Sequence, residues 1–168
     1  MIDIHCHILP GIDDGARDIT ESAEMVNMAR LNKIDAIIAT PHFTDFNKIE
    51  DFLFNRYEAI QKFKGVLDSF DNKPAVAYGA EVFLDSKVFT VGTLDELTLN
   101  GSRYMLCEYT LEPFNPEKAV VYAEEICARG YIPIIAHPER YISFAQNPTV
   151  VNRLWDTGCK FQVNASSL

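Results

Sequence analysis

Met1-Ile2-Asp3-Ile4-His5-Cys6-His7 is an apolar run that ends in two histidines separated by one residue. If residues 1–6 form a β-strand, successive side chains alternate between its two faces, so the imidazoles of His5 and His7 share one face. Two neutral imidazoles that converge at the end of a strand make half of a metal site. This stretch therefore predicts a strand whose carboxyl end binds metal.

The other two histidines of the chain stand in similar surroundings. His42 follows the apolar run of residues 34–39 and the pair Thr40-Pro41, and His137 follows the apolar run of residues 131–136. The carboxyl ends of parallel strands meet at one edge of a sheet or barrel, so we expect all four histidines at one rim. A histidine that simply packs in the core is the alternative for His42 taken by itself.

Short apolar runs alternate with segments of helical period, which predicts an α/β fold built from repeated βα units. We expect one helix to begin at the capping sequence Asp18-Ile19-Thr20-Glu21 and others over residues 48–70, 116–130 and 147–158. Six strands are expected, near residues 1–6, 35–40, 74–84, 104–109, 132–136 and 160–164. This order of elements favours a single domain with a parallel sheet or part of a barrel.

Three acidic residues lie in or beside the same strands. Glu81 lies in an otherwise apolar strand, where an ionised carboxylate is costly unless it is paired or bound to metal. Glu108 ends another apolar run, and Asp14 lies in the loop Gly11-Ile12-Asp13-Asp14-Gly15 directly after the first strand. The alternatives are an exposed edge position for Glu81, a salt bridge for Glu108 and ordinary turn chemistry for the loop. As ligands, the three carboxylates would complete the site that the histidines begin.

A compact polar group follows the strand that leads to the last histidine. Its sequence is His137-Pro138-Glu139-Arg140. A helix or loop cap would explain this group, but a histidine followed by an arginine three residues later also suits a metal site that binds an oxyanion.

The composition excludes several classes of protein. The chain has 168 residues, with 15 Lys and Arg against 24 Asp and Glu, which gives a formal net charge of −9. Such a surface has no basic footprint for nucleic acid or for anionic membranes. No apolar stretch reaches the roughly 20 residues of a membrane span. The first residues lack the basic-then-apolar pattern of a secretion signal, so we expect no membrane insertion and a cytoplasmic protein.

The four cysteines argue against two further kinds of protein. They are widely spaced and form no C-x-x-C pair, so reduced buried thiols are expected rather than a disulfide framework. None has an arginine six positions later, so the phosphate loop of cysteine-dependent phosphatases is absent from this sequence.

These motifs together resemble the polymerase and histidinol phosphatase (PHP) superfamily, and more closely its bacterial branch of capsule- and exopolysaccharide-associated protein tyrosine phosphatases. The matching segments span the chain: residues 2–15, 39–42, 79–81, 106–109, 135–141 and 162–168. The resemblance implies a distorted (β/α)7 barrel with a centre of up to three metal ions, most often manganese, with iron or zinc as alternatives. The metal ligands that it implies are His5, His7, Asp14, His42, Glu81, Glu108 and His137, with Glu81 bridging.

The resemblance also implies an activity and a partner. Members remove phosphate from tyrosines in the tail of a membrane-linked tyrosine kinase that controls polysaccharide export. Arg140 matches an arginine that grips the phosphoryl group, and we expect Arg140 and His42 to act in the catalytic step. The sequence leaves the oligomeric state open.

The sequence departs from the family pattern at its end. In the family a late strand supplies an Asp-x-His pair and a further arginine, whereas no Asp-x-His lies between Gln162 and Leu168. We therefore expect residues 1–168 to form one PHP-type domain without the family's C-terminal segment, with about six strands and no seventh. Such an incomplete barrel should expose strand edges and apolar surface. Metal affinity should fall below that of the family, because two ligands are absent.

The expected function is metal-dependent hydrolysis of phosphotyrosine on a protein. Metal ions at the rim would lower the pKa of water toward roughly 7 and neutralise phosphoryl oxygens, and Arg140 would add bidentate contacts. Two alternatives stay open: a small-molecule phosphatase of the histidinol phosphate type, and an inactive remnant that binds only a kinase or metal.

Overall fold

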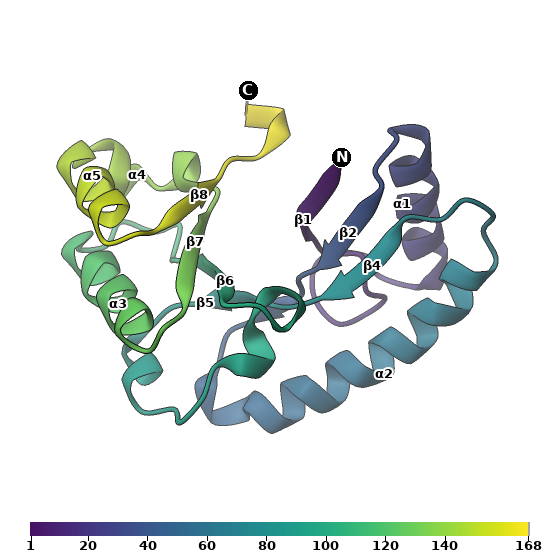
Figure 1. Cartoon of the computed structure of the whole chain (residues 1–168), viewed down its shortest axis with the longest axis horizontal. Helices are drawn as coiled ribbons and strands as arrows, with labels where there is room; N and C mark the ends of the chain where they lie inside the picture. The colour runs from purple at the N-terminus through teal and green to yellow at the C-terminus, as the bar shows by residue number, and fades with distance from the viewer. Residues whose placement is uncertain (168) are drawn as a thin grey trace.

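The strands of the computed structural model form two parallel sheets (Figure 1). The first has the order β1 (Ile2–Cys6), β2 (Ala36–Ala39) and β4 (Ala75–Tyr78). The second has the order β3 (His42–Phe43), β5 (Glu81–Phe83), β6 (Tyr104–Glu108), β7 (Ile132–Ala136) and β8 (Lys160–Gln162). The structure describes residues 1–167, without the side chain of Ser166, and Leu168 at the end of the last quoted motif lies outside the described residues.

The two sheets are joined by strands that bend. β2 leads into β3 through Thr40-Pro41, and β4 leads into β5 through Gly79-Ala80. Across the bends the Gly79 N–H donates to the Ala39 carbonyl at 2.9 Å, and the Glu81 N–H donates to the Pro41 carbonyl at 3.0 Å. Pairing is thus kept through both bends, and the eight strands follow the six strand paths expected from the sequence. The result is an incomplete barrel.

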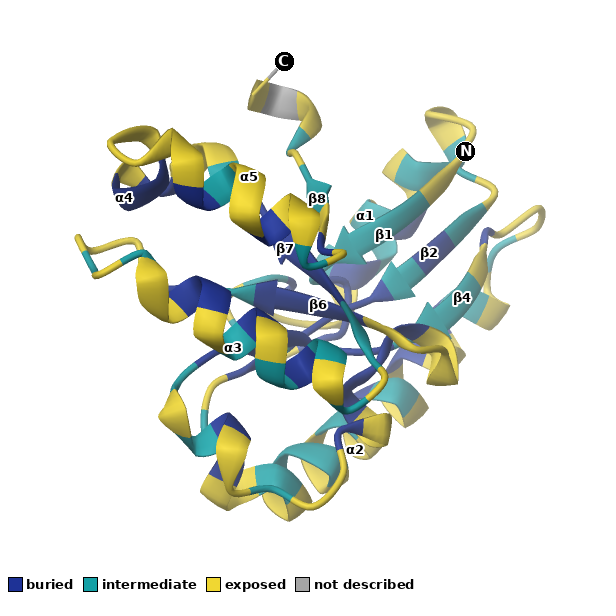
Figure 2. Ribbon diagram, turned by 60° about the vertical axis from the view of Figure 1, so that its left-hand side comes forward, coloured by how far each residue is buried: buried dark blue, intermediate teal, exposed yellow. Residues whose placement is uncertain are grey.

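Helices cover the outer faces of the two sheets (Figure 2). They are α1 (Ile19–Leu31), α2 (Ile49–Asp68), α3 (Glu117–Ala128), the short α4 (Ile142–Ala145) and α5 (Pro148–Asp156). Asp18 caps α1 as expected, because its side chain accepts from the Thr20 and Glu21 N–H groups. Glu21 does not complete a capping box but accepts from the Arg17 N–H at 2.7 Å.

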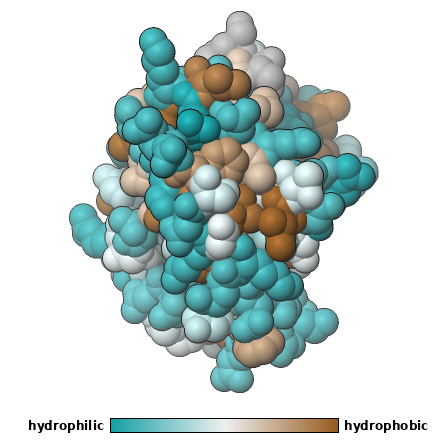
Figure 3. All heavy atoms as spheres, turned by 90° about the vertical axis from the view of Figure 1, so that its right-hand side faces the viewer, coloured by the Kyte–Doolittle hydropathy of each residue, from teal (hydrophilic) through white to brown (hydrophobic). Residues whose placement is uncertain are grey.

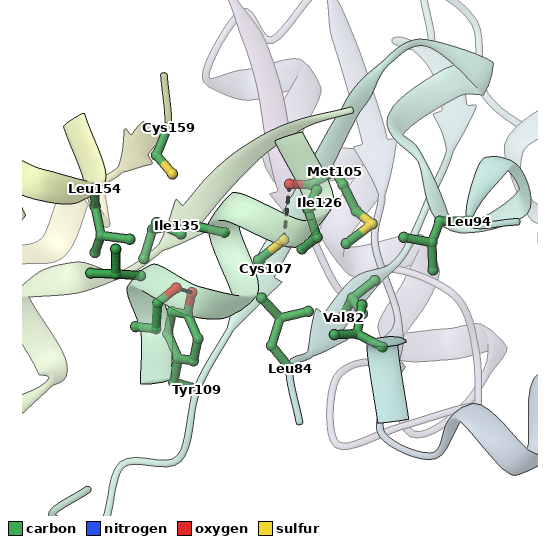
Figure 4. Packing of buried hydrophobic residues seen from close by; sticks show 14 of the residues in the cluster. Val82, Leu84, Leu94, Met105, Cys107, Tyr109, Ile126, Ile135, Leu154 and Cys159 are labelled. Carbon is green, nitrogen blue, oxygen red and sulfur yellow. Dashed lines mark hydrogen bonds between the residues drawn. The ribbon is translucent and has the colours of Figure 1, made fainter. Parts of the chain in front are cut away.

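Two main apolar clusters hold the sheets and helices together. The larger packs β5, β6 and β7 against α3, α4 and α5, with Val82, Met105 and Ile126 fully buried (Figure 4). The other packs α1 and α2 on β2 and includes Val26 and Phe63. Each such side chain stabilises the fold by roughly 1.5–3 kcal/mol on burial, which fixes the strand ends that carry the site.

The barrel is open between β1 and β8, which face each other in Figure 1. Within the described residues, β1 pairs only with β2 and β8 only with β7. A cavity of about 410 Å³ lies between the two edges, and the exposed side chains of Ile2 and Val163 belong to it. The exposed edges and apolar surface expected from the sequence are therefore found along this side.

The outer surface contains further apolar patches. The face on the side of α1 and the end of α2 is mainly hydrophilic but is interrupted by apolar groups (Figure 3). Met28 and Leu31 of α1 are among the exposed large apolar side chains. In the part of the chain that the structure describes, no helix combines the length and apolarity that crossing a membrane requires.

Candidate metal centre

The predicted site residues converge where β1, β6 and β7 end and where β3 and β5 begin, a few residues beyond the ends of β2 and β4. β1 carries His5 and ends just before His7, while His42 opens β3 and Glu81 opens β5. Glu108 is the last residue of β6, and His137 directly follows β7. A cavity of about 410 Å³ is lined by these residues together with Asp14, Gly15, Leu111, Arg140 and Asn164. The structure thus brings together every residue that the sequence placed at the rim.

Glu81 lies at the centre of the cluster, with its side chain only 1% exposed. Its Oε2 atom lies 3.1 Å from His5 Nε2, 3.1 Å from His7 Nε2 and 3.3 Å from His42 Nδ1. Its Oε1 atom lies 2.9 Å from His137 Nε2. One carboxylate therefore contacts all four histidines of the chain, as a carboxylate that bridges metal ions would.

Three groups of side chains have ligand atoms close enough to share an ion. They are His5 with His7 and Glu81, His7 with Asp14 and His42, and His42 with Glu81 and Glu108. The groups overlap in His7, His42 and Glu81, so three ions bound there would be neighbours. Mixed imidazole and carboxylate donors suit Mn, Fe and Zn.

Several features of this site fit a bound cation better than a set of protein hydrogen bonds. Among the described residues, the buried His42 Nδ1 has no hydrogen-bond partner, although Glu108 Oε1 lies 2.8 Å away. The Nε2 atoms of His5 and His7 are only 3.1 Å apart. His137 has a left-handed backbone, with φ 33° and ψ 54°. Strain of this kind costs about 1–3 kcal/mol and is typical of functional sites. The donor set therefore fits the metal ions that the family resemblance implies.

The charges within the cluster depend on one another. Burial alone would lower the pKa of His7, but hydrogen bonds with Asp13 and Glu81 outweigh it and raise that pKa to about 10. Burial alone would raise the pKa of Glu81, but hydrogen bonds with His137, His5 and His7 hold it well below its ordinary value. In the metal-free protein, a proton on His7 thus balances the charge of the neighbouring carboxylates, and a metal ion bound to His7 would displace one proton.

Asp13 is a site residue that the sequence did not single out. Its buried Oδ2 lies 2.7 Å from His7 Nδ1, while Asp14 is 83% exposed with Oδ1 3.4 Å from His42 Nε2. The adjacent Gly15 passes so close to His7 that an added Cβ would lie 2.2 Å from the His7 carbonyl oxygen. The paired aspartates between glycines were the signal in the sequence, but they did not show which carboxylate is buried.

Gln162 is a second contact that the sequence left without a role. Its Oε1 lies 2.8 Å from His5 Nδ1, so β8 reaches His5 of β1 across the open side of the barrel. Residues 162–168 are one of the segments that resemble the family, but their sequence does not predict a contact between Gln162 and His5.

Arg140 lies at the rim of the same cavity. It ends the short 3-10 helix Pro138–Arg140 and is exposed. Among the described residues it forms no ion pair, whereas other arginines such as Arg17, Arg129 and Arg153 do. Its guanidinium is therefore available for an anion that enters the cavity.

The four cysteines are free thiols, as expected. Burial raises the pKa of Cys6 to about 12 and that of Cys159 to about 11. Burial also raises the pKa values of Cys107 and Cys127. A thiolate is the nucleophilic form of cysteine, so none of the four is prepared for nucleophilic attack.

Comparisons with known proteins agree with the fold. The chain is similar to tyrosine-protein phosphatase YwqE of Bacillus subtilis (strain 168), with 36% identity over 171 residues, which cover 100% of this chain and 66% of the relative. It is 30% identical to tyrosine-protein phosphatase CpsB of Streptococcus pneumoniae over 174 residues, which cover 98% of this chain and 68% of the relative.

A solved structure has the same fold. It is described as one of the crystal structures of YwqE from Bacillus subtilis and CpsB from Streptococcus pneumoniae, unique metal-dependent tyrosine phosphatases. The TM-score is 0.84 at 34% identity, and the match covers 100% of this chain and 68% of that one. The chain thus spans about two thirds of the length of these relatives. The family model for capsular polysaccharide synthesis, CpsB/CapC, matches residues 1–168, and the chain belongs to this family.

Proposed function

We propose that this chain hydrolyses phosphotyrosine on a protein substrate with the help of divalent metal ions. The observation that carries the proposal is the convergence of four imidazoles on the buried Glu81 carboxylate, beside an exposed arginine that forms no ion pair within the described residues. The names of the relatives, tyrosine-protein phosphatases, support the same activity. Residues 1–168 act in this proposal as one PHP-type domain.

Each part of the cavity has a role in binding a phosphotyrosyl side chain. Divalent ions, when bound, would supply Lewis-acid activation of water and neutralise charge on the phosphoryl group. His5, His7 and the carboxylates would hold these ions, with His42 shared between two ligand groups. His137, whose Nε2 lies 2.9 Å from Glu81 Oε1, would add a further nitrogen ligand. Arg140 would donate paired hydrogen bonds to phosphoryl oxygens. Leu111, which is 48% exposed at the cavity wall, would contact the aromatic ring.

The proposal also names a metal, a partner and a location. Manganese is our first choice, and the nitrogen and oxygen donors also admit iron and zinc. The partner that we propose is the phosphorylated tail of a tyrosine kinase that regulates capsular or exopolysaccharide synthesis, and the location is the cytoplasm. The net charge of −9 is unfavourable for a nucleic-acid substrate.

The test is a phosphatase assay on the full chain with a phosphotyrosine peptide. Chelation should abolish turnover, and added Mn²⁺ should restore it. His137→Ala should lower kcat/KM by about 100-fold, because the variant removes a proposed metal ligand, and loss even of a group that only orients a ligand costs about 10- to 100-fold. Tyr57→Ala on the exposed face of α2 serves as the control and should retain activity.

Three other results would contradict the proposal. Turnover that survives both chelation and His137→Ala would exclude the metal mechanism. Faster turnover of histidinol phosphate than of the peptide would favour the small-molecule alternative. Bound metal without turnover of any phosphoester would identify an inactive metal-binding protein.

A further inference from the structure

Asp13 is buried beside the metal centre, although its neighbour Asp14 is exposed. Its side chain is only 5% exposed, and both of its oxygens accept hydrogen bonds. Oδ2 lies 2.7 Å from His7 Nδ1 and accepts from the His42 N–H at 3.0 Å. Oδ1 accepts from the Gly15 N–H at 3.0 Å. Asp13 therefore connects the loop to two of the residues that surround Glu81.

The contact to His7 determines which ring nitrogen can bind a cation. An ionised carboxylate accepts hydrogen bonds and has no proton to donate, so His7 Nδ1 must carry a proton to bond with Asp13. The lone pair is then left to Nε2, which lies 3.1 Å from the Glu81 carboxylate. A carboxylate on the far nitrogen also makes an imidazole a stronger metal donor.

We propose that Asp13 is a positioning residue: its carboxylate fixes the proton of His7 on Nδ1 and aims Nε2 at the metal centre, without itself binding an ion. The proposal rests on the metal site of the proposed function and adds a residue to it. It also separates the roles of two adjacent aspartates, since Asp14 belongs to a candidate ligand group and Asp13 does not.

His5 provides an internal comparison. Its Nδ1 faces the Oε1 atom of Gln162 at 2.8 Å, which is an uncharged acceptor. His5 and His7 are thus oriented by different parts of the chain. The neutral amide of Gln162 in β8 contacts His5, and the carboxylate of Asp13 in the loop after β1 contacts His7. We therefore expect His7 to depend on the charge of its partner.

An asparagine cannot replace Asp13 in this arrangement. The three donors around Asp13 use both of its oxygens, and the amide nitrogen of Asn would face either the Gly15 N–H or the N–H groups of His7 and His42. In the first case the Gly15 N–H would be left unsatisfied. In the second case the His42 N–H would be left unsatisfied, and His7 would lose its acceptor or move its proton to Nε2 and block that atom.

The experiment compares Mn²⁺ binding to the full wild-type chain and to Asp13→Asn, by competition with a chromophoric chelator. Loss of such a partner lowers metal affinity by about 10- to 100-fold. We expect this loss in Asp13→Asn with an unchanged number of ions at saturation. Asp18→Asn is the matched control, because Asp18 accepts two backbone N–H groups at the start of α1. Its affinity should stay within about twofold of the wild type, since the large losses arise at residues that contact a metal ligand.

A second measurement does not depend on the folding of any variant. Ring ¹⁵N–¹H spectra of the wild-type chain saturated with Zn²⁺ should show the His7 proton on Nδ1. A proton on Nε2, wild-type affinity in Asp13→Asn, or the loss of one whole ion from that variant would overturn the proposal. If the wild-type chain binds neither Mn²⁺ nor Zn²⁺, the metal site itself is refuted. If it binds them and Asp13→Asn behaves like the wild type, only the role of Asp13 is refuted.

Discussion

Replacing Glu81 by glutamine should weaken the fold as well as the site. Glu81 is 1% exposed, and its two oxygens lie within 3.3 Å of nitrogens of four histidines. In Glu81→Gln an NH₂ group, which cannot accept a hydrogen bond, would replace one of these oxygens. The imidazoles would then lose the most deeply buried carboxylate that contacts them, since Glu81 is 1% exposed, whereas Asp13 is 5% and Glu108 13% exposed.

The size of the effect follows from this burial. Removing one partner of a buried ion pair costs about 3–5 kcal/mol. For a domain of this length each kcal/mol lowers Tm by about 2–4 °C, so we expect Tm to fall by roughly 6–20 °C. The pKa of Glu81 is lowered in the folded state, so its stabilisation is present above its unfolded pKa and is lost as pH falls. At pH 6 the full effect should therefore be visible.

The assay is thermal unfolding of the chelated protein at pH 6, followed by circular dichroism. Glu96→Gln is the control, because it makes the same substitution at an exposed glutamate. Added Mn²⁺ at 100 times its Kd should stabilise the wild type by about 2.7 kcal/mol and leave Glu81→Gln nearly unchanged. A Tm shift no larger than that of Glu96→Gln, or an undiminished response to Mn²⁺, would refute the central role of Glu81.

Three further predictions concern single residues. The pKa of His7 is raised from 6.5 to about 10, so the protonated His7 stabilises the fold fully below pH 6.5, and this stabilisation disappears as pH rises toward 10. The Tm of the chelated protein should therefore fall between pH 6.5 and 10, and it should fall less in His7→Gln. Gly15→Ala should destabilise the protein by about 1–3 kcal/mol in urea unfolding, because the added Cβ would overlap His7. Gly65→Ala in α2, where the added Cβ has open space, should be neutral or stabilising. Equal effects of the two substitutions would contradict the close packing of Gly15 against His7. Alkylation of Cys127 by iodoacetamide should leave phosphatase activity intact, and activity that falls in step with labelling would point to a thiol mechanism instead.

Much of this fold could be predicted because its signals are local. β-branched runs ended by His5, His42 and His137 identify both the strands and the rim at which they finish. Glu81 stood out because a charge inside an apolar strand requires a partner. These features depend on alternation and on the cost of burying charge, which a sequence displays directly.

The remaining features depend on contacts between distant segments. Gly79 bends its strand where an added Cβ would lie 2.9 Å from the side chain of Leu99. The buried position of Asp13 depends on how closely Gly15 approaches His7. Gln162 meets His5 although the two residues are 157 positions apart in the sequence. Neither neighbouring residues nor periodicity carries this information.

The most direct test of the account is anomalous diffraction at the manganese edge from crystals of this chain grown with Mn²⁺. We predict a peak within coordination distance of His5 Nε2, His7 Nε2 and Glu81 Oε2, with further peaks beside His42. Peaks confined to surface carboxylates, with none in the cavity around Glu81, would contradict it.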